Sequence, residues 1–174
     1  MRIDLNEEMT GRILDVGGGG EGVIGLRYGR NVIAIDNCPE ELDEAPNACE
    51  KRMMDAAALD FPAETFDHVT FFYSLLYMTE ETQRKAVAEA ARVLKNGGML
   101  WIWDTEVESA YPEPFTVDLT VGLPGREIRT TYGIVKRDSQ SADGIRRMAE
   151  TSGLAVERAR QEKGQFLLCC RKEA

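Results

Sequence analysis

Short apolar runs recur along the first two thirds of the chain, and four of the five end at or close to an aspartate. The clearest runs occupy residues 12–16, 31–36, 66–74 and 99–104, and a weaker run occupies residues 51–55. Continuous runs of this length, rich in β-branched and aromatic residues, are typical of strands that are buried on both faces. The pattern therefore predicts five strands of a parallel sheet.

Helix signals lie between these runs. The segment after Thr79 is the clearest, because Val87, Ala91 and Leu94 recur at helical spacing behind a capping residue. Helices that alternate with strands indicate an α/β fold. We expect helices after the glycines of residues 17–22, from Pro39, from Thr79 and from Ser141, ending near Gly29, before Pro46, at residues 96–98 and at Gly153.

Residues 105–138 change from helical spacing to strict alternation. Apolar side chains alternate with polar ones over residues 115–121 and 128–134, on either side of Pro124-Gly125. This pattern predicts an inserted hairpin with one apolar face. Because such a face must be buried, two roles stay open: a cover over the substrate, or the contact of a homodimer.

The two ends of the chain carry weaker signals. Residues 154–160 and 165–171, joined around Gly164, predict a terminal hairpin whose last strand runs against the others. Residues 1–10 are polar and show no periodicity. We therefore expect the first strand near Arg12, with little cover from the amino-terminal residues.

The chain length of 174 residues suits one domain. We predict a single α/β domain over residues 1–174, with a doubly wound, mostly parallel seven-stranded sheet and helices on both faces. The hairpin of residues 105–138 is an insertion into this pattern.

Composition narrows the classes of partner. The formal net charge is −9 at pH 7, which argues against a dedicated binder of nucleic acid or of an anionic membrane. The four cysteines show no metal-ligand spacing, and His68 is the single histidine, so we expect no metal site. We expect a structural His68, because it lies at the opposite end of the run of residues 66–74 from the edge where ligands collect. With neither a signal-peptide pattern nor a long apolar stretch, we expect a cytoplasmic protein.

The glycine-rich stretch of residues 11–22 indicates a cofactor-binding turn between a strand and a helix. Gly17, Gly19 and Gly22 match the dinucleotide spacing, but Asp15 and Glu21 would repel a diphosphate at the helix start. S-adenosylmethionine (SAM) carries no phosphate and has a positive sulfonium and an ammonium, so the acidic setting favours SAM. A glycine turn without a ligand is the alternative.

Aspartates at four predicted strand ends support a cationic ligand. Asp36 lies 19 residues after Gly17, one βαβ unit, where its carboxylate can accept from ribose hydroxyls. Asp55 is placed to accept from an adenine amine, and Asp15 and Asp104 end two further runs. Each of the four is open to the alternative of an ordinary surface acid. Together they predict a negative potential suited to a sulfonium.

Four motifs in order resemble class I SAM-dependent methyltransferases of the small-molecule type: residues 13–22, 32–36, 66–67 and 92–99. The resemblance implies that Gly17 and Gly19 line the methionine tail, that Asp36 holds the ribose, and that Asp55 and Ala56 flank the adenine. It also implies that Phe72 or Tyr73 contacts the methionine end. The chain departs from the pattern at Glu21, where many members have glycine.

Taken together, the motifs predict these cofactor-binding residues: Asp15, Gly17, Gly18, Gly19, Asp36, Asn37, Asp55, Ala56, Phe72 and Tyr73. Methyl transfer needs in-line positioning more than a base. If the acceptor must lose a proton, Tyr77 and Asp104 are the candidate bases, and Tyr77, Tyr111 and Tyr132 are candidate walls of the acceptor site. A structural role is the alternative for each of these residues.

The sequence therefore predicts methyl transfer from SAM to a small-molecule acceptor, leaving S-adenosylhomocysteine (SAH). Two alternatives stay open at this point. One is a non-catalytic SAM-binding or partner subunit, and the other is an NAD(P)-dependent oxidoreductase.

Overall fold

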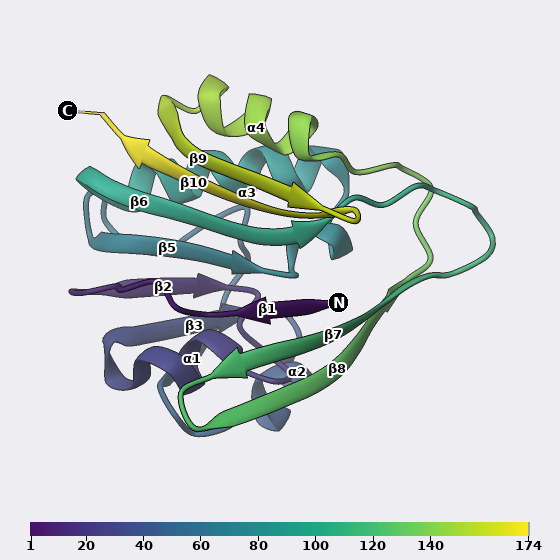
Figure 1. The fold of residues 1–174 in the computed structure, drawn as a ribbon. Helices are drawn as coiled ribbons and strands as arrows, with labels where there is room; N and C mark the ends of the chain where they lie inside the picture. The colour runs from purple at the N-terminus through teal and green to yellow at the C-terminus, as the bar shows by residue number, and fades with distance from the viewer. Residues whose placement is uncertain (174) are drawn as a thin grey trace.

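The computed structural model describes residues 1–173, and Figure 1 shows a central sheet with helices packed against it. None of the helices in these residues is long and apolar enough to cross a bilayer. In chain order the elements are β1 (Arg2–Asp4), β2 (Ile13–Val16), α1 (Val23–Tyr28), η1 (Gly29–Asn31), β3 (Val32–Asp36), α2 (Pro39–Glu44), β4 (Glu50–Met53), β5 (Phe66–Phe72), η2 (Leu75–Tyr77), α3 (Glu80–Val93), β6 (Leu94–Thr105), β7 (Phe115–Leu123), β8 (Arg126–Ile134), α4 (Ala142–Thr151), β9 (Leu154–Glu162) and β10 (Gln165–Lys172).

The main sheet has seven strands in the order β4-β3-β2-β5-β6-β10-β9. The first five are parallel, whereas β10 runs antiparallel to both β6 and β9. The predicted mostly parallel seven-stranded sheet is confirmed. Parallel pairing brings the carboxyl ends of β2, β3, β4 and β5 to one edge, where an open α/β sheet collects its ligands.

The two faces of this sheet are packed by different elements. One face buries Leu14, Val16, Leu100 and Ile102 against α3 and α4. The opposite face buries Trp101 and its neighbours against α1 and against the inserted hairpin. Because side chains alternate along each strand, the same runs supply both cores.

The inserted segment forms the predicted hairpin, with β7 and β8 antiparallel from Phe115 paired with Ile134 to Leu123 paired with Arg126. Its buried residues, Val117, Leu119, Val121 and Leu123, belong to the same hydrophobic cluster as Trp101 and Trp103. The apolar face of the hairpin is therefore covered within the molecule. This removes the physical reason for which a homodimer through that face was considered.

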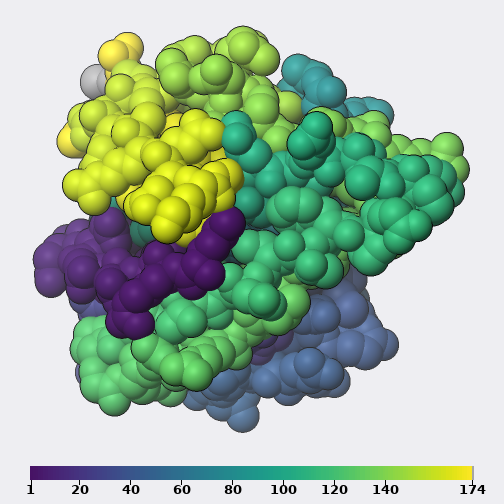
Figure 2. Space-filling view, turned by 45° about the vertical axis from the view of Figure 1, so that its right-hand side comes forward, coloured from purple at the N-terminus to yellow at the C-terminus, as the bar shows by residue number. Residues whose placement is uncertain are grey.

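The expectation for the first ten residues is wrong. β1 pairs in parallel with β7 and makes a three-stranded sheet of order β1-β7-β8, and Leu5 and Met9 are buried. In Figure 2 this purple segment lies between the green hairpin and the yellow carboxyl-terminal strands. The pairing is with residues more than 100 positions away, so local periodicity carried no sign of it.

The junction of α3 and β6 also differs from the prediction. Thr79 caps α3 as expected, accepting a hydrogen bond from the Thr82 amide at 3.2 Å. The helix ends at Val93, before residues 96–98, and β6 begins at Leu94. Leu94 pairs with Phe66 and is buried, so a tertiary contact ends the helix earlier than its apolar spacing indicates.

Candidate functional site

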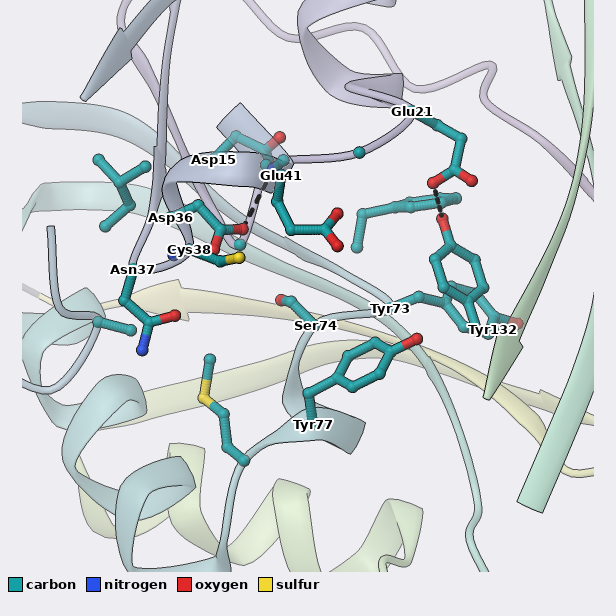
Figure 3. A pocket seen from close by; sticks show the side chains of 18 of the residues that line it. Asp15, Glu21, Asp36, Asn37, Cys38, Glu41, Tyr73, Ser74, Tyr77 and Tyr132 are labelled. Carbon is teal, nitrogen blue, oxygen red and sulfur yellow. Dashed lines mark hydrogen bonds between the residues drawn. The ribbon is translucent and has the colours of Figure 1, made fainter. Parts of the chain in front are cut away.

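A cavity with a volume of about 970 Å³ lies at the carboxyl edge of the parallel strands. Its walls come from the loop after β2, from the ends of β3, β4 and β5, from η2 and α2, and from β8 of the hairpin (Figure 3). The predicted residues that line it are Asp15, Gly17, Gly18, Gly19, Asp36, Asn37, Asp55, Ala56, Phe72, Tyr73, Tyr77 and Tyr132.

The glycine loop is held tightly against the elements around it. The amides of Gly17 and Gly18 both donate to the Ile35 carbonyl, at 2.8 and 3.0 Å. A Cβ on Gly17 would come within 2.4 Å of the Ser74 Cβ, and Gly17 has a φ of +75°, which side chains other than glycine avoid. A Cβ on Gly19 would likewise come within 2.6 Å of Glu41. The glycines therefore let β3, β5 and α2 close around the loop.

Asp36 ends β3 with its carboxylate held in place by two backbone amides. Its Oδ2 accepts from Gly19 at 3.3 Å, and its Oδ1 accepts from Cys38 at 3.0 Å. Figure 3 shows this carboxylate beside the glycine loop, on the same side of the cavity as Asn37. Two carboxylate oxygens have about four acceptor sites, so the group retains capacity for the hydroxyls of a ligand.

Asp15 lies beneath the glycine loop and is buried. Its Oδ1 accepts from the Thr70 hydroxyl at 2.7 Å, while its Oδ2 accepts no hydrogen bond from residues 1–173. Burial raises the pKa of Asp15 to about 7, with a smaller contribution from the nearby charge of Asp36. A cation in the cavity would favour the charged form of this group.

Glu41, at the cavity wall, also has a raised pKa. Burial, followed by the neighbouring carboxylates of Asp36, Glu44 and Glu21, raises its pKa. The acidic residues that line the cavity are Asp15, Glu21, Asp36, Glu41, Glu44 and Asp55. Among the described residues, no lysine, arginine or histidine lines it. The cavity therefore presents a surplus of negative charge to its ligand.

Three tyrosines form the wall next to the hairpin. The rings of Tyr73 and Tyr132 stack at a centroid distance of 5.1 Å and an interplanar angle of 14°. The Tyr132 hydroxyl donates to Glu21 at 3.2 Å, and the Thr130 hydroxyl donates to the other oxygen of Glu21. Tyr77 stands across from this pair on η2 (Figure 3). Glu21, where the chain departs from the glycine pattern, thus joins the glycine loop to the hairpin.

Asp104 and Tyr111 do not reach this cavity. Asp104 has no exposed surface, and its oxygens accept from the amides of Leu76 and Thr105 and from the Gln140 side chain. Burial raises its pKa to about 7. This placement corrects the expectation that Asp104 faces the acceptor: the carboxylate instead fixes η2, which carries Tyr77.

Tyr111 lies in the loop before β7, with half of its surface exposed. Its ring lies under the guanidinium of Arg137 at 4.3 Å, and its hydroxyl accepts from the same side chain at 3.0 Å. The expectation that Tyr111 forms a wall of the acceptor site is therefore corrected. His68 is also outside the cavity, where its Nδ1 accepts from the Trp101 indole at 3.2 Å.

Sequence reasoning missed several residues of the cavity wall, among them Glu41, Glu44, Ser74, Met54, Met78 and Thr131. Glu41 and Glu44 lie three apart on α2, the helix that follows Asp36. This spacing puts both side chains on one face of the helix, and it is the only sign in the sequence that they act together. The direction of that face depends on how α2 packs against the glycine loop, and only the structure gives it.

These features fit SAM and disfavour a dinucleotide. The cavity combines a bare glycine loop, a strand-end carboxylate able to accept from ribose hydroxyls, and a surplus of acidic groups. The positive charges of SAM are matched there, whereas a diphosphate would face carboxylates with no basic group among the lining residues.

Comparisons with known proteins agree with this geometry. The model of a family described as "Methyltransferase domain" matches residues 14–102, half of the chain. No curated protein matches the sequence.

Three solved structures illustrate the likeness of the fold. A Pyrococcus horikoshii OT3 protein is 16% identical with a TM-score of 0.69, the alignment covering 95% of this chain and 84% of that one. A SAM-dependent methyltransferase from Methanosarcina mazei is 16% identical with a TM-score of 0.64, covering 93% and 92%. An amino pentose methyltransferase from Micromonospora echinaspora, solved with SAM bound, is 18% identical with a TM-score of 0.66, covering 93% and 83%.

The family match spans the glycine loop, Asp36 and the strands that form the carboxyl edge of the sheet. These are the motifs on which the resemblance to class I enzymes rests. The chain belongs to the methyltransferase domain family, as a class I SAM-dependent methyltransferase.

Proposed function

We propose that this enzyme transfers a methyl group from SAM, bound along the glycine loop, to a small-molecule acceptor bound beside the tyrosine wall of Tyr73, Tyr77 and Tyr132. The observation that carries the proposal is the position of Asp36. Its carboxylate lies at the end of β3, oriented by the amides of Gly19 and Cys38, and faces a cavity large enough for a cofactor and a small acceptor.

Each part of SAM has a matching group in the cavity wall. Asp36 would accept from the ribose hydroxyls, and Asp55 and Ala56 would flank the adenine. Asp15 and the loop of Gly17–Gly19 line the part of the cavity where the methionine tail would lie, with Asp15 facing its ammonium. Phe72 and Tyr73, at the end of β5, would contact the sulfonium end.

SAM supplies an electrophilic methyl group on a positive sulfur that is already a good leaving group. The protein therefore has to hold the acceptor in line and exclude water, and needs no dedicated base. Tyr77 keeps its proton at neutral pH, because burial raises the pKa of its phenol. We assign Tyr77 to the wall of the acceptor site.

We assign the hairpin of residues 105–138 the role of substrate cover. Thr131, Tyr132 and Gly133 of β8 line the cavity, opposite the ends of the parallel strands. The hairpin also hydrogen-bonds to the glycine loop through Glu21, so it closes the side of the cavity that the strands leave open. An acceptor enclosed in this way is a small molecule.

Replacing Asp36 by alanine tests the assignment of the ribose. Loss of two charge-assisted hydrogen bonds should weaken SAM binding roughly 10- to 100-fold, with the fold intact. Calorimetric titration with SAM measures the change, and circular dichroism checks the fold. Asp43→Ala is the matched control, because Asp43 is exposed on α2 and does not line the cavity. Equal affinities for Asp36→Ala and the wild type would reject the assignment.

A further inference from the structure

We propose that the methyl acceptor is a small amine, recognised as its cationic ammonium by the tyrosine wall and by Glu21. This inference rests on the proposed function, because it names the acceptor class of the same cavity. It starts from the part of the cavity that is left once SAM occupies the glycine loop, Asp36 and Asp55.

The remaining part of the cavity is bounded by aromatic rings from three separate elements. Tyr73 directly follows β5, Tyr77 lies on η2 and Tyr132 lies on β8, and all three line the cavity. Tyrosine faces carry negative electrostatic potential and attract ammonium groups, an effect that strengthens where water is excluded. Tyr77 faces this space with about half of its surface exposed (Figure 3).

The wall is rigid, because neighbouring groups fix its rings. The Tyr73 ring stacks on Tyr132, and its hydroxyl accepts from the side-chain Nε2 of Gln165 at 2.5 Å. The Tyr132 hydroxyl is held by Glu21. A preformed aromatic wall favours affinity, since little side-chain freedom is lost on binding.

The charges around this space select a cation. Glu21 and Glu41 face it, and no basic side chain lines the cavity among residues 1–173. Lys136, which follows β8, donates to the carbonyls of Leu76 and Met78 at 3.2 and 2.7 Å and does not line the cavity. A carboxylate or phosphate acceptor would therefore meet only like charge. An amine meets opposite charge and aromatic faces.

The reaction is balanced without a protein base. The ammonium first releases a proton to solvent, and the lone pair of the neutral amine forms the new N–C bond. The bond between the methyl carbon and sulfur breaks, and the sulfur keeps the electron pair, so SAM becomes SAH. The methylated amine is again a cation until it loses its proton outside the cavity.

Choline and its neutral isostere 3,3-dimethylbutan-1-ol test the recognition directly. Both are titrated by calorimetry into the 174-residue protein saturated with SAH, and the binding of SAH itself is measured first. We expect choline to bind at least about tenfold more tightly than the alcohol. Equal or tighter binding of the alcohol would overturn the inference.

Variants of Tyr77 test whether its aromatic ring is responsible for binding choline. Tyr77→Leu should lower choline affinity by about 3- to 30-fold, whereas Tyr77→Phe, which keeps the aromatic face, should restore it. Tyr111→Leu is the matched control, because Tyr111 is as exposed as Tyr77 but lies outside the cavity. Unchanged choline affinity in Tyr77→Leu would overturn the inference while leaving the proposed function standing. Failure of the wild-type protein to bind SAH would overturn both.

Discussion

At the scale of single residues, buried carboxylates decide the chemistry of the cavity. Asp15 and Asp104 are both buried, and burial raises the pKa of each to about 7, yet only Asp15 lines the cavity. The sequence predicts an acidic strand end at both positions, but it does not indicate that Asp104 turns toward Gln140. Part of the negative charge of the cavity comes from additional acids such as Glu41, which no strand-end pattern marks.

Asp15→Asn tests how much the buried carboxylate of Asp15 lowers the stability of the fold. A folded-state pKa of about 7, above the usual 3.8 of the unfolded chain, means that stability falls as pH rises between these values. An asparagine retains an oxygen that accepts from Thr70 and removes the titration. The ligand-free variant should therefore gain stability over the wild type as pH rises from 4 to 7, on the order of 4 kcal/mol by pH 8.

Urea unfolding of the variant and the wild type at pH 4, 6 and 8 measures the difference between their free energies of unfolding. Asp104 titrates in both proteins, so its contribution cancels in the comparison. Calorimetry at pH 8 should show weaker SAM binding by the variant, because the charge facing the ammonium is gone. A stability difference that stays constant with pH would contradict the pKa assigned to Asp15.

At the scale of elements, local sequence patterns predict some helices and strands well, whereas others form only through pairing with distant residues. Helix caps at Thr79 and Ser141 and the alternation within the hairpin predict their elements closely, because the signals lie within a few residues. β1 has only three residues and is formed through pairing with β7, so its sequence carries no period to detect. The early end of α3 has the same kind of cause, since Leu94 pairs with Phe66.

Leu5→Ala tests whether the amino-terminal segment supports the hairpin. Leu5 is fully buried beside β1, and its amide donates to the Gly122 carbonyl at 3.0 Å. Truncating a buried leucine should lower the free energy of unfolding by about 2–4 kcal/mol in urea denaturation. Met53→Ala, at a side chain that is 70% exposed, is the control and should change it by less than about 0.5 kcal/mol. Similar values for both variants would show that the segment is not part of the core.

At the scale of the whole molecule, the cavity forms where two sheets meet. The carboxyl edge of the parallel sheet supplies the glycine loop and Asp36, and the small sheet supplies Tyr132, with Glu21 hydrogen-bonded between them. Sequence order alone predicts the first wall, because every parallel strand ends at that edge. It does not predict the second wall, since nothing local specifies where an inserted hairpin packs.

Parallel titrations with SAM and with NADH test the central claim, that this acidic cavity binds a cationic methyl donor and rejects a dinucleotide diphosphate. Both ligands are titrated by calorimetry into the wild-type protein at the same pH and ionic strength. We expect saturable SAM binding at least about 100-fold tighter than NADH binding, a difference of roughly 2.7 kcal/mol. NADH binding as tight as or tighter than SAM binding would contradict it.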